Sequence, residues 1–365
     1  MRLQHLLCIL IILCVSGCGR FSGQNDDYQT LTCNLLWERL ADCKGEIGKE
    51  KGEASIEAAL FSPDGKIVAS VSQKGSDIIL WNAESGESIW ETSMDFPLKA
   101  VQFTPDNNYL LVGGESRYLK ILNTKSGEFI KNLDGKDNIE CIAVSNKKEF
   151  IAVGNEAGKI IICRIADFEK VKEIQNDTGE EKKDINAVQF SENDKYLISG
   201  GYNSVINYYK IKSDFSKERS IKKESGSVKS IQISPNGKYL ASSSTKRDID
   251  KVPANALYVW DMKTGANIYT QHFDFGIEAV EFSPNGQFLL AGGTEGKNIK
   301  GPFAGYGNIY VYKINENPDG PYLKLVNKIK AFRAEYLQFN KEGDRLLSAH
   351  EDGSIKMWEV AYIKN

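Results

Sequence analysis

A segment of about fifteen residues recurs seven times along this chain, and this repetition constrains the fold more than any other feature. Each copy contains two apolar runs joined by a short turn, as in "IEAALFSPDGKIVAS" at residues 56–70. One apolar residue marks the same position in every copy: Phe61, Phe103, Val144, Phe190, Ile233, Phe282 and Phe339. The intervals between them are 42, 41, 46, 43, 49 and 57 residues. A period slightly above 40 is typical of the four-stranded blades of a β-propeller.

The turn within each copy predicts a β-hairpin. In Ser62-Pro63-Asp64-Gly65, proline presets φ at the first corner, aspartate tolerates the second, and glycine takes the left-handed position. A third strand is expected after each hairpin, and it carries a large apolar residue near its end: Trp81, Leu122, Cys163, Tyr209, Trp260, Tyr312 and Trp358. The sequence therefore predicts an all-β chain folded as a single seven-bladed propeller of four-stranded antiparallel blades.

The last repeat lacks room for its own fourth strand, because only seven residues follow Trp358. We expect a strand near the start of the propeller domain, assigned to residues 31–365, to complete that blade and remove the exposed sheet edges. Two candidates lie within residues 31–52. Hydrophobicity favours "NLLWERLA" at 34–41, and spacing favours "GEIGKE" at 45–50.

Three dipeptides at the ends of the predicted third strands resemble the Trp-Asp signature of the WD-repeat family. They are Trp81-Asn82, Trp260-Asp261 and Trp358-Glu359, and the resemblance covers roughly residues 45–365. The resemblance implies the propeller fold. The family also has a Gly-His pair before the first strand of a repeat, which supplies the histidine of a hydrogen-bonded tetrad. Here His272 lies one residue away from that place, so the tetrad is not expected in most blades.

The N-terminal segment reads as an address signal. The apolar run at residues 6–15 is ten residues long, which is too short for a membrane span of about 20 residues and suits the core of a signal peptide. Val15-Ser16-Gly17-Cys18 resembles the bacterial lipobox. That resemblance implies cleavage after residue 17 and a diacylglycerol on Cys18, and Gly19 favours the outer membrane. We therefore expect a signal peptide at 1–17, a lipidated tether at 18–30, and a location in the bacterial cell envelope.

Composition argues against several function classes. The formal net charge of −3 does not favour nucleic-acid binding. Only His272 and His350 would remain after cleavage, and neither His-Glu-x-x-His nor Gly-x-Ser-x-Gly occurs. The segment "AGGTEGKN" at 291–298 departs from the phosphate-loop pattern at its first and last positions. We expect no catalytic residues, no metal and no cofactor.

The cysteines of the mature chain fall into two groups. Cys33 and Cys43 flank the predicted closing segment and are a candidate disulfide in an oxidising envelope. Cys141 and Cys163 belong to the first and third strands of one blade, about 9.6 Å apart, which exceeds the reach of a disulfide of roughly 7 Å. We expect these two to be buried thiols.

Two adjacent repeats carry insertions between their second and third strands, at residues 245–255 and 294–308. Both loops are expected on one face of the propeller, and insertions often lie on the binding face of repeat proteins. The alternative is neutral growth of loops at tolerant sites. The candidate partner-binding residues are Lys246, Arg247, Lys251, Lys297, Lys300, Phe303 and Tyr306.

These observations predict a monomeric, membrane-anchored, non-catalytic scaffold that binds a protein or peptide on its loop face. One alternative is a propeller-type envelope enzyme, quinoprotein or lactonase-like, because "LWNAESGESIW" at 80–90 resembles the quinone-type propeller repeat. Another is an outer-membrane assembly lipoprotein.

Overall fold

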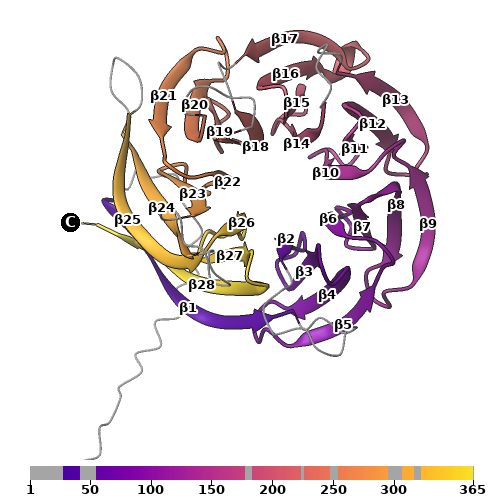
Figure 1. Cartoon of the computed structure of the whole chain (residues 1–365), viewed down its shortest axis with the longest axis horizontal. Helices are drawn as coiled ribbons and strands as arrows, with labels where there is room; N and C mark the ends of the chain where they lie inside the picture. The colour runs from indigo at the N-terminus through magenta and orange to yellow at the C-terminus, as the bar shows by residue number, and fades with distance from the viewer. Residues whose placement is uncertain are drawn as a thin grey trace, which may run out of the picture.

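The structure is a computed structural model, and it describes residues 28–41, 55–176, 183–222, 226–246, 254–294, 306–315 and 322–364. Within these ranges the chain forms 28 strands in seven four-stranded antiparallel sheets, with one short 3-10 helix, η1 (Ile211–Ser213). The sheets are arranged as blades around a central axis (Figure 1). The prediction of an all-β, seven-bladed propeller is confirmed. The predicted signal peptide and Cys18 lie outside the described residues.

The blades are numbered in chain order, and the innermost strand of each comes first. Blade 1 contains β2 (Ile56–Phe61), β3 (Ile67–Ser72), β4 (Asp77–Asn82) and β5 (Ser88–Ser93). Blade 2 contains β6 (Leu98–Phe103), β7 (Tyr109–Gly114), β8 (Ser116–Asn123) and β9 (Phe129–Asp134). Blade 3 contains β10 (Ile139–Val144), β11 (Phe150–Asn155), β12 (Lys159–Arg164) and β13 (Lys170–Gln175).

The remaining blades follow the same order until the last. Blade 4 contains β14 (Ile185–Phe190), β15 (Tyr196–Gly201), β16 (Val205–Lys210) and β17 (Ser216–Lys222). Blade 5 contains β18 (Ser227–Ile233), β19 (Tyr239–Thr245), β20 (Ala256–Asp261) and β21 (Asn267–His272). Blade 6 contains β22 (Ile277–Phe282), β23 (Phe288–Thr294), β24 (Tyr306–Asn315) and β25 (Tyr322–Phe332). Blade 7 contains β26 (Ala334–Phe339), β27 (Arg345–His350), β28 (Ser354–Ile363) and, outermost, β1 (Thr30–Leu40).

The ring is closed by β1, which pairs antiparallel with β28. Leu31 is opposite Tyr362, and Cys33 is opposite Val360. The candidate "NLLWERLA" is thus confirmed as part of the closing strand, whereas "GEIGKE" lies outside the described residues. The strand starts at Thr30, the last residue of the predicted tether.

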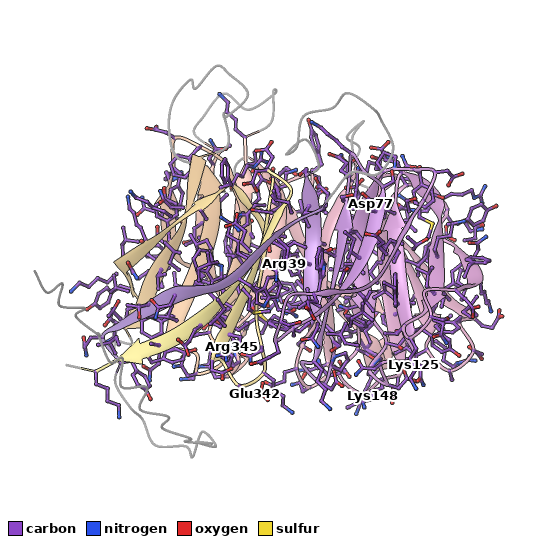
Figure 2. The ribbon with its side chains drawn as sticks, turned by 90° about the horizontal axis from the view of Figure 1, so that it is seen from below. Arg39, Asp77, Lys125, Lys148, Glu342 and Arg345 are labelled. Atoms are coloured by element: carbon purple, nitrogen blue, oxygen red, sulfur yellow. The ribbon has the colours of Figure 1, made fainter. Side chains whose placement is uncertain are left out.

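The strand β1 also holds blade 1. The Trp37 indole N–H donates to the carbonyl of Ala83 at 3.1 Å, and Arg39 Nε donates to the carbonyl of Gly86 at 2.8 Å. Gly86 has φ +68°, and a Cβ there would lie 2.7 Å from the Trp37 ring. Trp90 on β5 makes the equivalent contact one blade further on. Strand β1 therefore acts as a genuine fourth strand, and Figure 2 shows Arg39 on it.

The predicted hairpin turns are confirmed. Gly65 has φ +72°, as the left-handed position requires. The Ser62 hydroxyl donates to Asp64 Oδ1 at 2.6 Å and accepts the backbone N–H of Ile67 at 3.0 Å. Because the side chains satisfy the polar groups of the turn, each inner hairpin is locally well defined.

Tryptophans of the third strands are anchored by serines of the second strands. The indole N–H donates to a serine hydroxyl in three pairs: Trp81 to Ser70 at 2.9 Å, Trp260 to Ser242 at 2.9 Å and Trp358 to Ser348 at 2.8 Å. Blade 7 adds a histidine, because His350 Nε2 lies 2.8 Å from the Ser348 hydroxyl. Its other ring nitrogen lies 3.0 Å from the carbonyl of Phe332, and burial lowers the pKa of His350 to about 4. Blade 7 therefore contains a histidine–serine–tryptophan contact, with the histidine at the end of β27 and not before β26.

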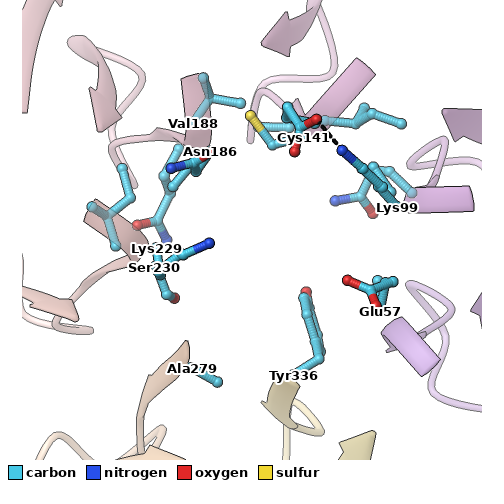
Figure 3. Close-up of a pocket in the computed structure, with 18 of the residues that line it drawn as sticks. Glu57, Lys99, Cys141, Asn186, Val188, Lys229, Ser230, Ala279 and Tyr336 are labelled. Carbon is cyan, nitrogen blue, oxygen red and sulfur yellow. Dashed lines mark hydrogen bonds and ion pairs between the residues drawn. The ribbon is translucent and has the colours of Figure 1, made fainter. Parts of the chain in front are cut away.

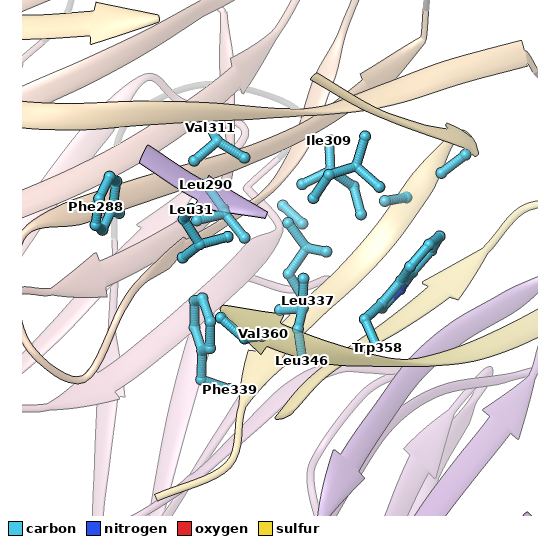
Figure 4. Packing of buried hydrophobic residues seen from close by; sticks show 14 residues of the cluster. Leu31, Phe288, Leu290, Ile309, Val311, Leu337, Phe339, Leu346, Trp358 and Val360 are labelled. Carbon is cyan, nitrogen blue, oxygen red and sulfur yellow. The ribbon is translucent and has the colours of Figure 1, made fainter. Parts of the chain in front are cut away.

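Apolar clusters fill the spaces between neighbouring blades. The cluster between blades 6 and 7 includes Leu31, Phe288 and Trp358, so the closing strand contributes directly to the core (Figure 4). Cys141 on β10 and Cys163 on β12 are free thiols; Cys163 is buried as predicted, whereas Cys141 is only partly buried. Cys33 pairs with no described cysteine, and Cys43 lies outside the described residues, so their pairing stays a prediction. The described part of the chain contains no helix with the length and apolar character of a membrane span.

Candidate functional site: the central channel

A cavity of about 650 Å³ occupies the centre of the propeller. Its walls come from the inner strands of all seven blades, and Figure 3 shows side chains from several of them pointing inward.

A β-bulge near the start of every inner strand gives the channel its polar lining. In β2 the pairing with β3 shifts between Ile56 and Ala58, which leaves Glu57 without a partner in the ladder. The same one-residue shift occurs in five other inner strands, and in β18 the shift spans Lys229 and Ser230. A bulge redirects the side chain of its extra residue. The redirected residues, which we call the polar ring, are Glu57, Lys99, Glu140, Asn186, Lys229, Glu278 and Glu335.

The residue after each ring position determines how much space remains. Six blades have a small residue there: Ala58, Ala100, Cys141, Ala187, Ser230 and Ala279. Blade 7 has Tyr336, whose ring projects into the channel near Glu57 (Figure 3). The channel is therefore open along most of its wall and narrowed by one aromatic side chain.

Two groups of ring charges are paired. Lys99 Nζ lies 2.5 Å from Glu140 and 3.3 Å from Glu156. Burial raises the pKa of Glu140 to about 7. These contacts link blades 2 and 3 across the channel wall.

The second group is centred on Arg333, just before β26. Its guanidinium lies 2.8 Å from Glu278, 2.9 Å from Glu335 and 3.5 Å from Glu351. Burial raises the pKa of Glu335 to about 8. The Thr245 hydroxyl also donates to Glu278, at 3.0 Å, so the end of β19 meets the ring.

Two residues of the polar ring, of opposite charge, can still form hydrogen bonds or ion pairs with a ligand. Glu57 accepts a hydrogen bond from the Ser55 hydroxyl at 2.9 Å, and burial raises its pKa against the opposing effect of nearby cations. Lys229 is exposed and has no hydrogen-bond or ion-pair partner among the described residues. Both side chains point into the channel with Tyr336 (Figure 3).

Further along the inner strands, amide side chains connect one blade to the next. Gln338 Oε1 accepts the backbone N–H of Phe61 at 2.8 Å, and Gln189 Oε1 accepts that of Ile233 at 3.0 Å. Glu281 occupies the same position in blade 6, and its Oε1 accepts the N–H of Phe339 at 3.2 Å. Its second oxygen is buried and has no hydrogen-bond partner among the described residues, and burial raises the pKa of Glu281 to about 8.

The predicted loop residues lie mostly outside the described ranges: Arg247, Lys251, Lys297, Lys300 and Phe303. Lys246 is exposed at the base of its loop, where its N–H donates to Asn255 at 2.6 Å. Tyr306 is the first residue of β24. Because Lys246 follows Thr245, which contacts Glu278, the base of this loop adjoins the polar ring.

Sequence reasoning missed the polar ring, although it left a signal. In all seven repeats a polar residue follows the first apolar residue of the inner strand and precedes a mostly small one. Alternation alone does not reveal that a bulge turns this residue toward the axis. Within the described ranges, no group of three or more His, Cys, Asp or Glu side chains is placed to hold a metal ion.

Comparison with known proteins gives two family matches. Residues 83–301 match the family described as "Nucleolar protein 10-like, N-terminal domain", and residues 331–359 match "WD domain, G-beta repeat".

Several curated eukaryotic proteins are similar over part of their length. Eukaryotic translation initiation factor 3 subunit I of Phaeosphaeria nodorum is 29% identical over 139 residues, which are 37% of this chain and 37% of that protein. The serine-threonine kinase receptor-associated protein of Gallus gallus is 26% identical over 60% of this chain and 58% of its own length. Pre-mRNA-processing factor 17 of Mus musculus is 22% identical over 86% of this chain and 51% of its own length. The chain spans 37% of the length of the initiation-factor subunits it matches.

Proposed function

The chain belongs to the family of nucleolar protein 10-like N-terminal domains, a WD-repeat propeller family, and from that premise we propose that it is a non-catalytic scaffold that binds a peptide segment of a protein partner at the mouth of its channel. The observation that carries this proposal is the polar ring, with Glu57 and Lys229 of opposite charge and with free capacity beside the open channel. A peptide that presents both charges satisfies both residues at once.

Rigidity supports this assignment. The ring residues are fixed by bulges of paired strands, and the paired charges around Lys99 and Arg333 hold the neighbouring positions. A site built on strands is preorganised, so a partner loses less free energy to ordering when it binds. The names "subunit" and "receptor-associated protein" among the relatives also describe proteins that act in association with others.

The proposal includes a membrane anchor. The lipobox Val15-Ser16-Gly17-Cys18 supports lipidation of Cys18 and delivery to the bacterial cell envelope, with Gly19 favouring the outer membrane. Residues of the inserted loops at 245–255 and 294–308 are proposed as secondary contacts for the partner. In this arrangement the lipid fixes the location and the propeller selects the partner.

Photo-crosslinking in intact envelopes tests the peptide site. A photoreactive residue at Gln73, which lines the channel mouth, is compared with one at Lys148 on the opposite face (Figure 2). We expect one partner to be captured from Gln73 only. A synthetic peptide from that partner should bind at least tenfold more weakly to Lys229→Ala and Glu57→Gln proteins. Equal capture at both positions, or unchanged affinity in both variants, would overturn the channel site.

The anchor is tested separately. Cys18→Ser should move the protein from the detergent-soluble membrane fraction to the soluble fraction, and mass spectrometry of the native chain should show acyl groups on Cys18. Retention of the variant in the membrane would contradict the anchor and leave the channel experiment interpretable.

A further inference from the structure

The outer hairpins of blades 6 and 7 are longer than those of the other blades. β24 and β25 have 10 and 11 residues, as do β28 and β1, whereas the outer strands elsewhere have six to eight. Figure 1 shows β25, β28 and the start of β1 together, outside the outline of the other blades. We call this region, residues 28–33, 322–326 and 360–364, the outer extension.

Contacts between the two hairpins hold the outer extension together. Asn327 Nδ2 donates to the carbonyl of Leu31 at 2.9 Å, which joins β25 to β1. The rings of Tyr28 and Tyr362 lie 5.3 Å apart, and the Tyr28 N–H donates to Gln287 at 3.1 Å. The extension is therefore a folded part of the propeller.

The surface of the outer extension combines apolar, aromatic and basic side chains. Tyr322 and Ile363 are 45% and 44% exposed, and Lys324 and Lys364 are exposed beside them in sequence. Lys364 Nζ lies 5.3 Å from the centre of the Tyr28 ring. None of the residues that define the extension is an aspartate or glutamate, while the segment 316–321, with Glu316 and Asp319, is outside the described ranges.

We propose that the outer extension contacts the surface of an anionic lipid bilayer. Tyrosine rings favour the boundary between headgroups and hydrocarbon, aliphatic side chains partition into it, and lysines are attracted to anionic lipids. This inference rests on the proposed anchor at Cys18. Tyr28 lies ten residues after Cys18, so the tether spans at most about 36 Å and keeps the extension near the bilayer.

The strand directions then fix the orientation of the propeller. The polar ring lies near the beginning of each inner strand, whereas the extension is formed where the third strands end and the fourth strands begin. Successive antiparallel strands place these two points at opposite ends of a blade. Contact through the extension therefore directs the channel mouth away from the lipid.

Lysine footprinting of the full lipidated chain tests this contact. The protein is placed in vesicles of phosphatidylglycerol and phosphatidylethanolamine and treated with an acetylating reagent, and each lysine is quantified by mass spectrometry. The Cys18→Ser protein in solution gives the reference rates. We expect Lys324 and Lys364 to react at least threefold more slowly in vesicles, with Lys74 and Lys246, which are exposed at the channel-mouth end of the blades, unchanged as controls.

Vesicle flotation of the Cys18→Ser protein separates the contact from the anchor. Binding should increase with the phosphatidylglycerol content and should fall at least threefold in the Lys324→Gln/Lys364→Gln and Tyr322→Ser/Ile363→Ser variants. Ile89→Ser/Phe129→Ser, which removes exposed apolar residues of blades 1 and 2, is the matched control and should bind as the parent does.

The outcomes are distinguishable. If acyl groups are absent from Cys18 but flotation and its variants behave as expected, the anchor fails and the lipid contact stands. If the lipidated protein floats while Lys324 and Lys364 react as fast as the controls, the anchor stands and the contact is overturned. Protection that depends on protein concentration and occurs without vesicles would show that a second copy covers the extension, which also overturns the proposal.

Discussion

The side-chain oxygen of Gln338, in blade 7, accepts the backbone N–H of Phe61, in blade 1, at 2.8 Å. This hydrogen bond crosses the junction where the first and last repeats meet, on the channel side. On the rim, Trp37 of β1 donates to Ala83 across the same junction. The ring is thus closed at its inner and outer surfaces by side chains far apart in sequence.

Gln338→Ala should destabilise the protein by about 1–3 kcal/mol, because it leaves the Phe61 N–H without its acceptor in a partly buried position. The matched control is Gln102→Ala. Gln102 occupies the same position in blade 2 but accepts the N–H of Phe103, its own neighbour, so no junction is affected. Chemical denaturation measures the free energy of unfolding of both variants. An equal loss of stability in the two variants would contradict a special role of the hydrogen bond at the junction.

Gly86→Ala should destabilise the protein more than Gly65→Ala. Both glycines have positive φ, +68° and +72°, so both substitutions introduce a similar strain of about 1–2 kcal/mol. Only Gly86 lies against Trp37, where a Cβ would be 2.7 Å from the ring, whereas a Cβ at Gly65 meets nothing within 4 Å. The difference in melting temperature between the variants reports the closing contact. Equal melting temperatures would show that Trp37 on β1 can move away from the added methyl group without loss of stability.

Glu281→Gln should change how stability depends on pH. Burial raises the pKa of Glu281 to about 8 in the folded state, above its unfolded value near 4.3. Its contribution to stability is therefore full below about pH 4 and is lost progressively as pH rises through 8. The glutamine keeps the acceptor for Phe339 and cannot ionise, so its stability should fall less between pH 6 and 9. Chemical denaturation at each pH measures this dependence. If the free energies of unfolding of both proteins change equally between pH 6 and 9, the raised pKa of Glu281 is contradicted.

Ser348→Ala should lower the free energy of unfolding more than Ser242→Ala does. Both serines accept an indole N–H, from Trp358 and Trp260, but Ser348 also contacts His350. Removing Ser348 leaves two buried partners unsatisfied, with an expected loss of about 2–4 kcal/mol against 1–2 kcal/mol for Ser242. Calorimetric unfolding of the two variants gives the comparison, and a larger loss for Ser242→Ala would argue against the histidine contact.

Much of the fold could be predicted because each blade is determined by interactions between residues of the same repeat. The turn at Gly65 and the tryptophans of the third strands are fixed by neighbours within one blade, so periodicity and turn chemistry are sufficient. The sequence left two candidates for the closing strand. The register of that strand could not be predicted, because the pairing of Leu31 with Tyr362 joins residues that are far apart in the sequence.

The candidate site was much harder to predict. The channel lining depends on a bulge in each inner strand, and a bulge changes the direction of Glu57 or Lys229 without changing the apolar pattern around it. The contact of His350 with Ser348 was not predicted for a related reason. His350 reaches Ser348 from the same strand, whereas the family pattern places the histidine before the first strand.

The pairing of β1 with β28 also sets an order of events during synthesis. Among these strands the ribosome releases β1 first and β28 last, so blade 7 stays open until β28 has been synthesised. Until then β1 carries the apolar residues Leu31 and Trp37 without the strand that covers them. A chain truncated before β28 would keep this unpaired strand exposed, so a closed propeller requires synthesis through β28.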